Sequence, residues 1–294
     1  MTDHIIRALS TSGGIRVLAC STAELTREIC SLHEASATVS IALGRGLAGG
    51  ALMGALLKSG QRLALKFEAN GPLGKMIIEA DSDGAVRGSV ANPLAEAEPQ
   101  GGRWNVADVL GRAGFLTVSK DLGLGGEPYH GIVQLRSSEI GDDLAYYLAD
   151  SEQTPTAVGL SAAFDETGQI SECGGFLVQA LPDADESKLE AVMANITSLP
   201  PLSIILREGG PQKLLELLFN TVEYTLLETR LPFFSCGCSR EKVERALLSF
   251  GSDELRDMNT KENGADVSCE FCRRTYHFDK IHLEKLIEAA NTHP

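Results

Sequence analysis

The sequence is poor in basic residues. Lysine and arginine number 26 against 40 aspartates and glutamates, which gives a formal net charge of −14 over 294 residues. A surface this acidic repels phosphate backbones, so the charge balance argues against a non-specific nucleic-acid binder. Hydrophobic residues at 43% and charged residues at 22% are ordinary values for a globular chain, and they exclude bulk disorder.

Long hydrophobic runs are also missing. The most apolar window, residues 41–57, spans only 17 residues and contains Arg45, whereas a membrane span needs about 20 residues. Residues 1–10 lack the basic end, the apolar stretch and the small-residue cleavage site of a signal peptide. We therefore expect a soluble, cytoplasmic protein that does not bind membranes.

Residues 1–180 combine one apolar helix with many short strands. Residues 38–57 are small or apolar on almost every face, which is typical of a helix buried on all sides. Asp83-Gly84 is a hairpin signal, and residues 156–164 are expected to pair with residues 170–180. Antiparallel sheets packed around the helix, and an α+β fold class, follow from this pattern. The other expected elements are helices over 23–34 and 138–150 and strands over 62–68, 74–80, 85–91, 115–119 and 131–136.

The pattern changes after Leu181-Pro182, and we predict a helical linker over residues 181–231. Apolar residues recur there at helical spacing in two stretches, Leu189, Val192, Met193 and Ile196 and then Leu214, Leu215, Leu218 and Val222. The stretches are interrupted at Pro200-Pro201 and Gly209-Gly210-Pro211. Isolated helices shorter than about 12–15 residues are marginal in water, so these apolar stripes must lie on another part of the protein.

Four of the seven cysteines form two closely spaced pairs within residues 232–294. The pairs are Cys236-Gly-Cys238 and Cys269-Glu-Phe-Cys272, and 30 residues separate them. In a reducing cytosol, such pairs are more often metal ligands or redox groups than structural disulfides. Zinc takes four thiolates at tetrahedral corners, and two such pairs brought together supply them. We predict one zinc ion per chain, with these four cysteines as its ligands.

Other interpretations of this region are weaker. His277 could replace one thiolate, but its alternation with Tyr276 and Phe278 favours a histidine on the surface of a strand. A thioredoxin-type active site would open a helix, whereas residues 273–278 look extended. Helices are expected after the caps Ser239 and Asp279, and the nine basic and eleven acidic residues of 232–294 do not suit a nucleic-acid reader. The other cysteines, Cys20, Cys30 and Cys173, are expected to be buried, inert thiols.

No sequence motif indicates a catalytic site convincingly. Gly44-Arg-Gly46-Leu-Ala-Gly49 imitates a dinucleotide fingerprint, but hairpins follow it where a parallel βαβ unit is required, so close packing of a buried helix is favoured. The sequence has no plausible Ser-His-Asp set or helical His-Glu-x-x-His, and Asp142-Asp143 is interpreted as a solvated helix face. A thiol oxidoreductase, a nucleotide-dependent catalyst and a zinc-ribbon nucleic-acid module are the alternatives.

The cysteine-containing tail closely resembles the heat-shock protein 33 family of redox-switched bacterial holdase chaperones. The resemblance is carried by Cys236-Gly-Cys238-Ser-Arg-Glu-Lys-Val-Glu-Arg-Ala-Leu, Val267-Ser-Cys269-Glu-Phe-Cys272 and Tyr276-His-Phe278. It extends over nearly the whole chain, through Gly71-Pro-Leu-Gly74, Val86-Arg-Gly88, Tyr129-His-Gly-Ile-Val133, Ser151-Glu-Gln-Thr-Pro155 and Gly174-Gly-Phe-Leu-Val-Gln179. Two departures are Ser138, where a glycine is expected, and Cys173, where a small residue is usual.

The resemblance implies an ATP-independent holdase that is not an enzyme. Its parts would be a sheet/helix/sheet domain (1–180), a helical linker (181–231) and a zinc-binding redox switch (232–294). It further implies that oxidation joins Cys236 to Cys238 and Cys269 to Cys272, releases zinc and leads to a homodimer. If the linker helices rest on the zinc module, its unfolding exposes apolar residues that bind unfolding client proteins, with Leu189, Met193, Leu214 and Leu218 as candidates.

Overall fold

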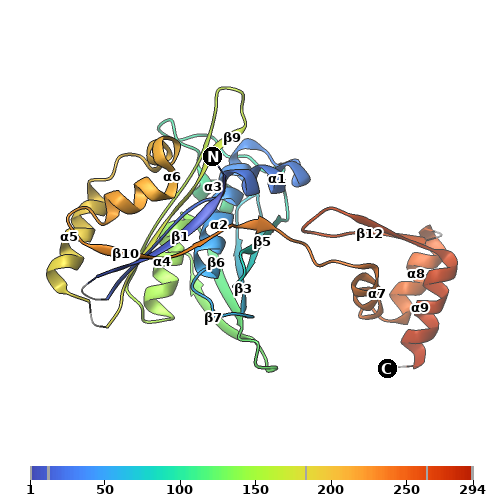
Figure 1. Cartoon of the computed structure of the whole chain (residues 1–294). Helices are drawn as coiled ribbons and strands as arrows, with labels where there is room; N and C mark the ends of the chain where they lie inside the picture. Colours follow the sequence, from blue (N-terminus) through green and yellow to red (C-terminus); the bar gives the residue numbers. More distant parts are fainter. Residues whose placement is uncertain (1, 12–13, 183, 263, 293–294) are drawn as a thin grey trace. The chain divides into compact units, whose positions relative to one another are not determined.

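The computed structural model describes residues 2–11, 14–182, 184–262 and 264–292. The chain separates into two compact units, Met1–Ser235 and Cys236–Pro294 (Figure 1). Each unit has a hydrophobic core of its own. The segment predicted as a linker, residues 181–231, therefore lies within the first unit.

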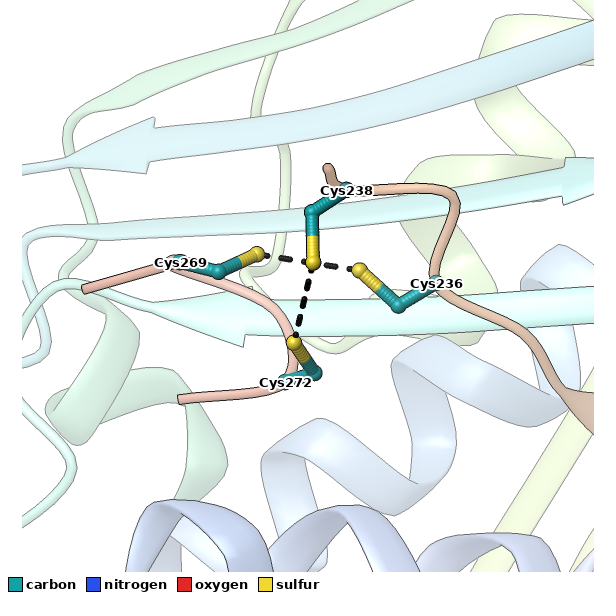
Figure 2. Close-up of side chains that lie close together, drawn as sticks. All are labelled: Cys236, Cys238, Cys269 and Cys272. Carbon is teal, nitrogen blue, oxygen red and sulfur yellow. Dashed lines mark hydrogen bonds between the residues drawn. The ribbon is translucent and has the colours of Figure 1, made fainter. Parts of the chain in front are cut away.

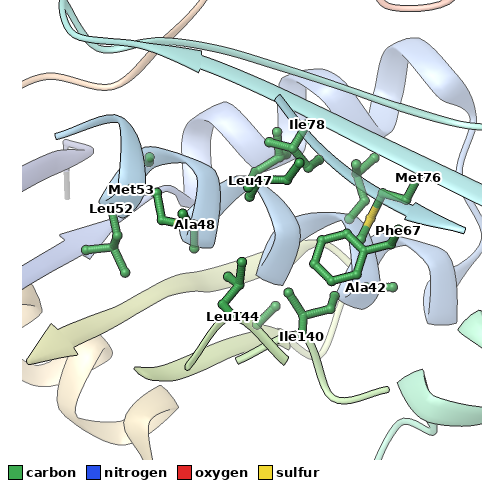
Figure 3. Packing of buried hydrophobic residues seen from close by; sticks show 14 of the residues in the cluster. Ala42, Leu47, Ala48, Leu52, Met53, Phe67, Met76, Ile78, Ile140 and Leu144 are labelled. Carbon is green, nitrogen blue, oxygen red and sulfur yellow. The ribbon is translucent and has the colours of Figure 1, made fainter. Parts of the chain in front are cut away.

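Helix α2 (Ala37–Gly54) is buried in the first unit, as the sequence predicts (Figure 3). It begins after Ser36, whose hydroxyl oxygen accepts a hydrogen bond from the backbone N–H of Val39 at 3.3 Å. Its neighbours approach so closely that a Cβ added at Gly49 would lie 2.5 Å from Leu144 Cδ1. The Gly-x-Gly-x-x-Gly pattern lies wholly inside this helix, which confirms that its glycines serve close packing.

A six-stranded sheet covers one side of α2. Its strand order is β11-β5-β4-β3-β6-β7, and all neighbours are antiparallel except β11 and β5. The predicted hairpin at Asp83-Gly84 is present, with Gly84 at a φ of 97° that glycine adopts without strain. The strands are β3 (Arg62–Ala69), β4 (Lys75–Asp81), β5 (Ala85–Val90), β6 (Gly114–Asp121), β7 (Tyr129–Gln134) and β11 (Phe233–Phe234).

A five-stranded antiparallel sheet covers the other side, with the order β10-β1-β2-β9-β8. The predicted pairing of β8 with β9 is confirmed, with Leu160 opposite Gly175. Strands of both sheets contact α2, so the first unit is a sheet/helix/sheet sandwich and the α+β class is confirmed. The strands are β1 (His4–Ser10), β2 (Ile15–Ser21), β8 (Thr156–Phe164), β9 (Ile170–Ala180) and β10 (Tyr224–Arg230).

Three further helices, α1 (Ala23–His33), α3 (Val106–Leu110) and α4 (Ile140–Asp150), pack around this sandwich. The expectation of a solvated Asp142-Asp143 face is wrong for Asp143, which is fully buried because its carboxylate accepts the backbone N–H groups of Arg136 at 2.8 Å and Ser137 at 3.3 Å. Burial raises the pKa of Asp143. Ser138 has a φ of 61°, the left-handed region that suits the glycine expected there.

The linker helices are α5 (Glu186–Thr197) and α6 (Leu202–Leu218), and α6 is kinked at Gly210, which has a φ of 61°. The apolar residues of α5 and α6 form a hydrophobic cluster with Val17 and Phe176 of the five-stranded sheet. The neighbouring residues Leu18 and Leu177 point to the opposite face of the sheet and pack in the core around α2. The two helices therefore cover the face of this sheet that points away from α2. The sequence left open which part of the protein supports these helices, and the structure shows that they pack on the five-stranded sheet. The last part of the predicted helical linker is strand β10.

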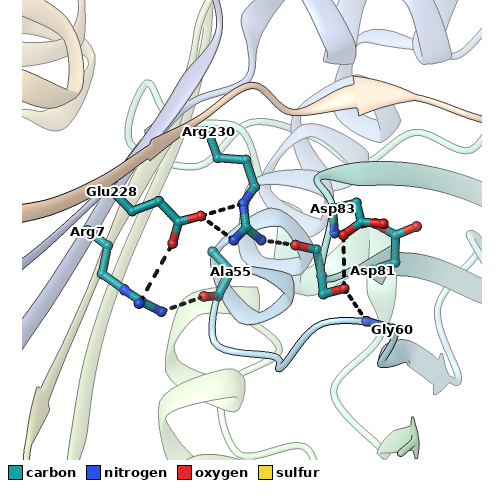
Figure 4. Close-up of polar contacts among 8 residues, drawn as sticks. Arg7, Ala55, Gly60, Asp81, Asp83, Glu228 and Arg230 are labelled. Carbon is teal, nitrogen blue, oxygen red and sulfur yellow. Dashed lines mark hydrogen bonds and ion pairs between the residues drawn. The ribbon is translucent and has the colours of Figure 1, made fainter. Parts of the chain in front are cut away.

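The chain then crosses from one sheet to the other through a strap, residues 224–234. Figure 4 shows its polar anchors. Glu228 pairs with Arg7 of β1 at 3.7 Å, and Arg230 Nε donates to the Glu228 carboxylate at 3.0 Å. Arg230 also donates to the carbonyl oxygen of Ser82, beyond β4. The strap is thus tied to β1 in one sheet and to the β4–β5 turn in the other.

The second unit contains a hairpin and three helices. The hairpin is β12 (Gly264–Ser268) with β13 (Thr275–Asp279), and the helices are α7 (Arg240–Leu248), α8 (Ser252–Glu262) and α9 (Lys280–Thr292). The predicted caps are confirmed, with Ser239 accepting from the Lys242 N–H at 3.3 Å and Asp279 from the His282 N–H at 2.9 Å. Helix α8 was not predicted. Across the described residues of both units, no helix has the length and apolarity to span a bilayer.

Candidate metal centre

The four clustered cysteines lie on two turns of the second unit. Cys236 and Cys238 precede helix α7, and Ser239, directly after Cys238, is the N-cap of that helix. Cys269 and Cys272 lie in the turn between β12 and β13. This turn is closed by backbone hydrogen bonds from Cys269 N–H to Arg274 and from Arg273 N–H to Cys269, both 2.9 Å long.

The structure brings the four sulfur atoms together, as Figure 2 shows. Cys236 Sγ lies 3.6 Å from Cys269 Sγ, and Cys238 Sγ lies 3.4 Å from Cys272 Sγ. All four sulfurs are within 4.8 Å of one another. A tetrahedral ion with metal–sulfur bonds of about 2.3 Å requires sulfur separations of about 3.8 Å. The four cysteines therefore fit one tetrahedrally coordinated metal ion.

The pKa values of these thiols are shifted in different directions. The hydroxyl of Tyr276 donates to Cys238 Sγ at 3.1 Å and lowers the pKa of Cys238 to about 7. Burial raises the pKa of Cys236, and it raises that of Cys272 to about 12. A bound divalent cation would hold all four sulfurs as thiolates, because metal ligation requires the deprotonated form.

Three basic side chains that follow the two turns in the sequence make different contacts. The pKa of Arg274 is raised by the Tyr276 hydroxyl and then by the sulfurs of Cys238 and Cys272, which places its charge beside the centre. Lys242 Nζ donates to the carbonyl oxygen of Gly237 and so fixes the first turn. Arg240 donates to the carbonyl oxygen of His277 at 3.0 Å and thereby joins α7 to β13.

The structure does not support the other interpretations of the histidine and cysteine residues. His277 is on the surface of β13, as predicted, with its Nδ1 2.7 Å from Asp266 Oδ1. Cys269 and Cys272 lead into a strand, which does not suit a thioredoxin-type active site. Cys20, Cys30 and Cys173 are buried in the first unit, and burial raises the pKa of each thiol, that of Cys30 to about 12.

The four apolar residues that the sequence analysis named as client-binding candidates lie in α5 and α6, the linker cover of the five-stranded sheet. Leu214 and Leu218 are fully buried in α6. Leu189 is partly buried in α5, and Met193 is 45% exposed on the same helix. In the folded protein this set is therefore mostly hidden, and only Met193 presents a large apolar surface to solvent.

A sheet/helix/sheet unit followed by a small unit with four converging cysteines defines a two-part protein whose cysteine cluster could hold a metal ion. Residues 3–279 match the family model described as Hsp33 protein. The chain is 76% identical over 290 residues to the 33 kDa chaperonin of Pelobacter propionicus, covering 99% of this chain and 95% of that one. It is 50% identical to the 33 kDa chaperonin of Geobacter sulfurreducens, over 97% of this chain and 95% of that one.

Among solved structures, the fold is similar to that of the 33 kDa chaperonin of Thermotoga maritima. The TM-score is 0.90 at 34% identity, and the match covers 99% of this chain and 100% of that one. The chain belongs to the heat-shock protein 33 (Hsp33) family. It is accordingly a chaperone, a protein that binds client proteins, and it is not an enzyme.

Proposed function

We propose that this chaperone is an ATP-independent holdase whose activity is switched by oxidation at the four-cysteine centre. The observation that carries the proposal is that four sulfurs converge from two turns 30 residues apart, in a unit whose described residues include five buried apolar side chains. A unit this small requires an additional stabilising link such as a metal ion, because a hydrophobic core of this size rarely supplies more than about 3–5 kcal/mol of folding stability. Structural zinc supplies about 10–16 kcal/mol of apparent binding energy.

In the reduced state, one zinc ion per chain would be held by Cys236, Cys238, Cys269 and Cys272. Zinc suits this set because it prefers soft thiolate ligands in a tetrahedral arrangement. Bound thiolates are also the form of cysteine that oxidants attack. The same four residues would therefore both hold the fold of the second unit and sense peroxide or hypochlorous acid.

Oxidation would convert the four thiolates into two disulfides. Each pair of thiolates gives up two electrons to one hydrogen peroxide, which leaves as two hydroxide ions while one sulfur–sulfur bond forms. Disulfides within the turns, Cys236–Cys238 and Cys269–Cys272, leave no bond between the two turns, so zinc departs and the tie across the 30-residue spacer is lost. Disulfides between the turns would preserve that tie.

Unfolding of the second unit would reach the linker through the strap. Cys236 follows the two-residue strand β11 after a single residue, and β10 lies at the edge of its sheet. Helices α5 and α6 depend on packing against that sheet, since α5 has 12 residues, the kink at Gly210 divides α6 into two shorter helices, and helices this short are marginal by themselves. Their release would expose Leu189, Met193, Leu214 and Leu218, an apolar and adaptable surface for unfolding proteins.

The setting of this activity is part of the proposal. We place the protein in the cytoplasm, where thiols are kept reduced until an oxidant appears. The oxidised form would associate as a homodimer, and the net charge of −14 would disfavour nucleic acid and anionic membranes as partners.

A light-scattering assay with a denatured client enzyme, without ATP, tests the proposal. The zinc-loaded reduced chain, the peroxide-treated chain and the re-reduced, zinc-reloaded chain are compared. We expect suppression of aggregation only by the oxidised chain, with peptide mapping showing disulfides within the two turns. Equal suppression by the zinc-loaded chain, or disulfides between the turns, would refute the switch.

A further inference from the structure

Tyr276 carries a hydroxyl that reaches the candidate metal centre from outside the ligand set. Its Oη donates to Cys238 Sγ at 3.1 Å. Two contacts at the centre join cysteine to cysteine, Cys236 to Cys269 at 3.6 Å and Cys238 to Cys272 at 3.4 Å. Tyr276 instead brings a donor to Cys238 from a side chain that does not belong to the ligand set.

The sheet fixes the position of this hydroxyl. Tyr276 is the second residue of β13, where it pairs with Val267 of β12, and its ring packs against the core of the second unit. Arg274, two residues earlier on the chain, interacts with the same hydroxyl and also lies near Cys238. The hairpin that carries Cys269 and Cys272 thus also positions a donor on a cysteine of the other turn.

A hydrogen bond to a thiolate stabilises its charge and so reduces its nucleophilicity. On this ground, and resting on the redox switch proposed above, we infer that Tyr276 is a positioning residue that restrains the reaction of Cys238 with oxidant. The step concerned is attack of the Cys238 thiolate on hydrogen peroxide, which breaks the oxygen–oxygen bond and gives sulfenic acid and hydroxide. The Cys236 thiolate then displaces a second hydroxide and forms the disulfide. Tyr276 thereby sets how fast the switch responds at a given peroxide concentration.

The test is Tyr276→Phe in the zinc-loaded full chain, which keeps the ring and removes the donor. We expect zinc release under excess peroxide, followed with a chromogenic indicator, to be about three- to tenfold faster than in the unsubstituted chain. Zinc transfer to a chelator without oxidant should change by less than about twofold, because all four ligands remain. In the cobalt-substituted protein, the sulfur-to-cobalt charge-transfer band should move to lower energy, since the sulfur becomes richer in electrons. Tyr129→Phe, on the exposed edge of β7, is the matched control and should change none of these readouts.

A second variant separates the hydrogen bond from packing. Site-specific 3-fluorotyrosine at position 276 keeps the ring and makes the hydroxyl a stronger donor, so peroxide-driven release should become slower. Equal peroxide rates for the Phe variant and the unsubstituted chain would overturn the inference while leaving the switch intact. Equal acceleration of the peroxide and chelator reactions would overturn it as well, because that result indicates a role in packing alone. No zinc release by the unsubstituted chain under peroxide would overturn both the switch and this inference.

Discussion

Chelating the proposed zinc ion from the reduced chain is expected to unfold residues 236–294 and to leave residues 1–235 folded. The described residues of the second unit include five buried apolar side chains, whereas the first unit encloses α2 between two sheets. Without the metal, the second unit loses a contribution of about 10–16 kcal/mol, which exceeds the roughly 3–5 kcal/mol that such a core supplies. Amide exchange should therefore lose protection in α7, α8 and α9 and keep it in α2 and β4.

Single substitutions sharpen this prediction. Cys272→Ser should bind zinc much more weakly and show the same loss of protection without any chelator. Cys173→Ala is the control, because Cys173 is fully buried in the first unit and belongs to no metal site among the described residues. The control should retain one zinc ion per chain. A second unit that keeps its amide protection after complete metal removal would show that the metal does not hold its fold.

Replacing Leu215 by alanine is expected to activate the chaperone partly without oxidation. Leu215 is fully buried where α6 packs on the five-stranded sheet. Truncating a buried leucine lowers folding stability by about 2–5 kcal/mol. Here the substitution weakens the packing of α6 on the sheet and leaves the core around α2 unchanged. The reduced, zinc-loaded variant should suppress client aggregation to a measurable extent in light scattering, with its zinc content unchanged.

Leu94→Ala provides the matched control for this variant. Leu94 is 70% exposed and lies outside the linker, so the same chemical change should alter stability by no more than about 0.5 kcal/mol. It should leave the reduced chaperone inactive. If Leu215→Ala loosens α6 in amide exchange and still leaves client aggregation unchanged, the face under α6 is not the surface that binds clients.

Local signals explain what could be predicted from the sequence. The apolar character of α2, the turn at Asp83-Gly84 and the pairing of β8 with β9 across a short turn are each contained in a short window, and the structure confirms all of them. The cysteine spacings likewise predicted which four sulfurs would converge. These features depend on chemistry that acts over a few residues, or on a metal with strict ligand requirements.

Contacts between distant segments explain what could not be predicted. Strand β10 pairs with β1 more than 200 residues away in the sequence, and its Leu226-Leu227 continues an apolar helical pattern that gives no sign of a strand. Asp143 is buried because a preceding turn supplies its donors, which no spacing rule reveals. The hydroxyl of Tyr276 reaches Cys238 only after the hairpin and the first turn have come together.

The central claim is that loss of the metal at the four-cysteine centre releases the linker cover of the first unit. Hydrogen exchange of the full chain tests it most directly, with α6 and β4 compared in the zinc-loaded and peroxide-treated states. The account predicts that oxidation removes protection from α7, α8 and α9 and also from α5 and α6, while β4 stays protected. Full protection of α5 and α6 in an oxidised chain whose second unit has unfolded would contradict it.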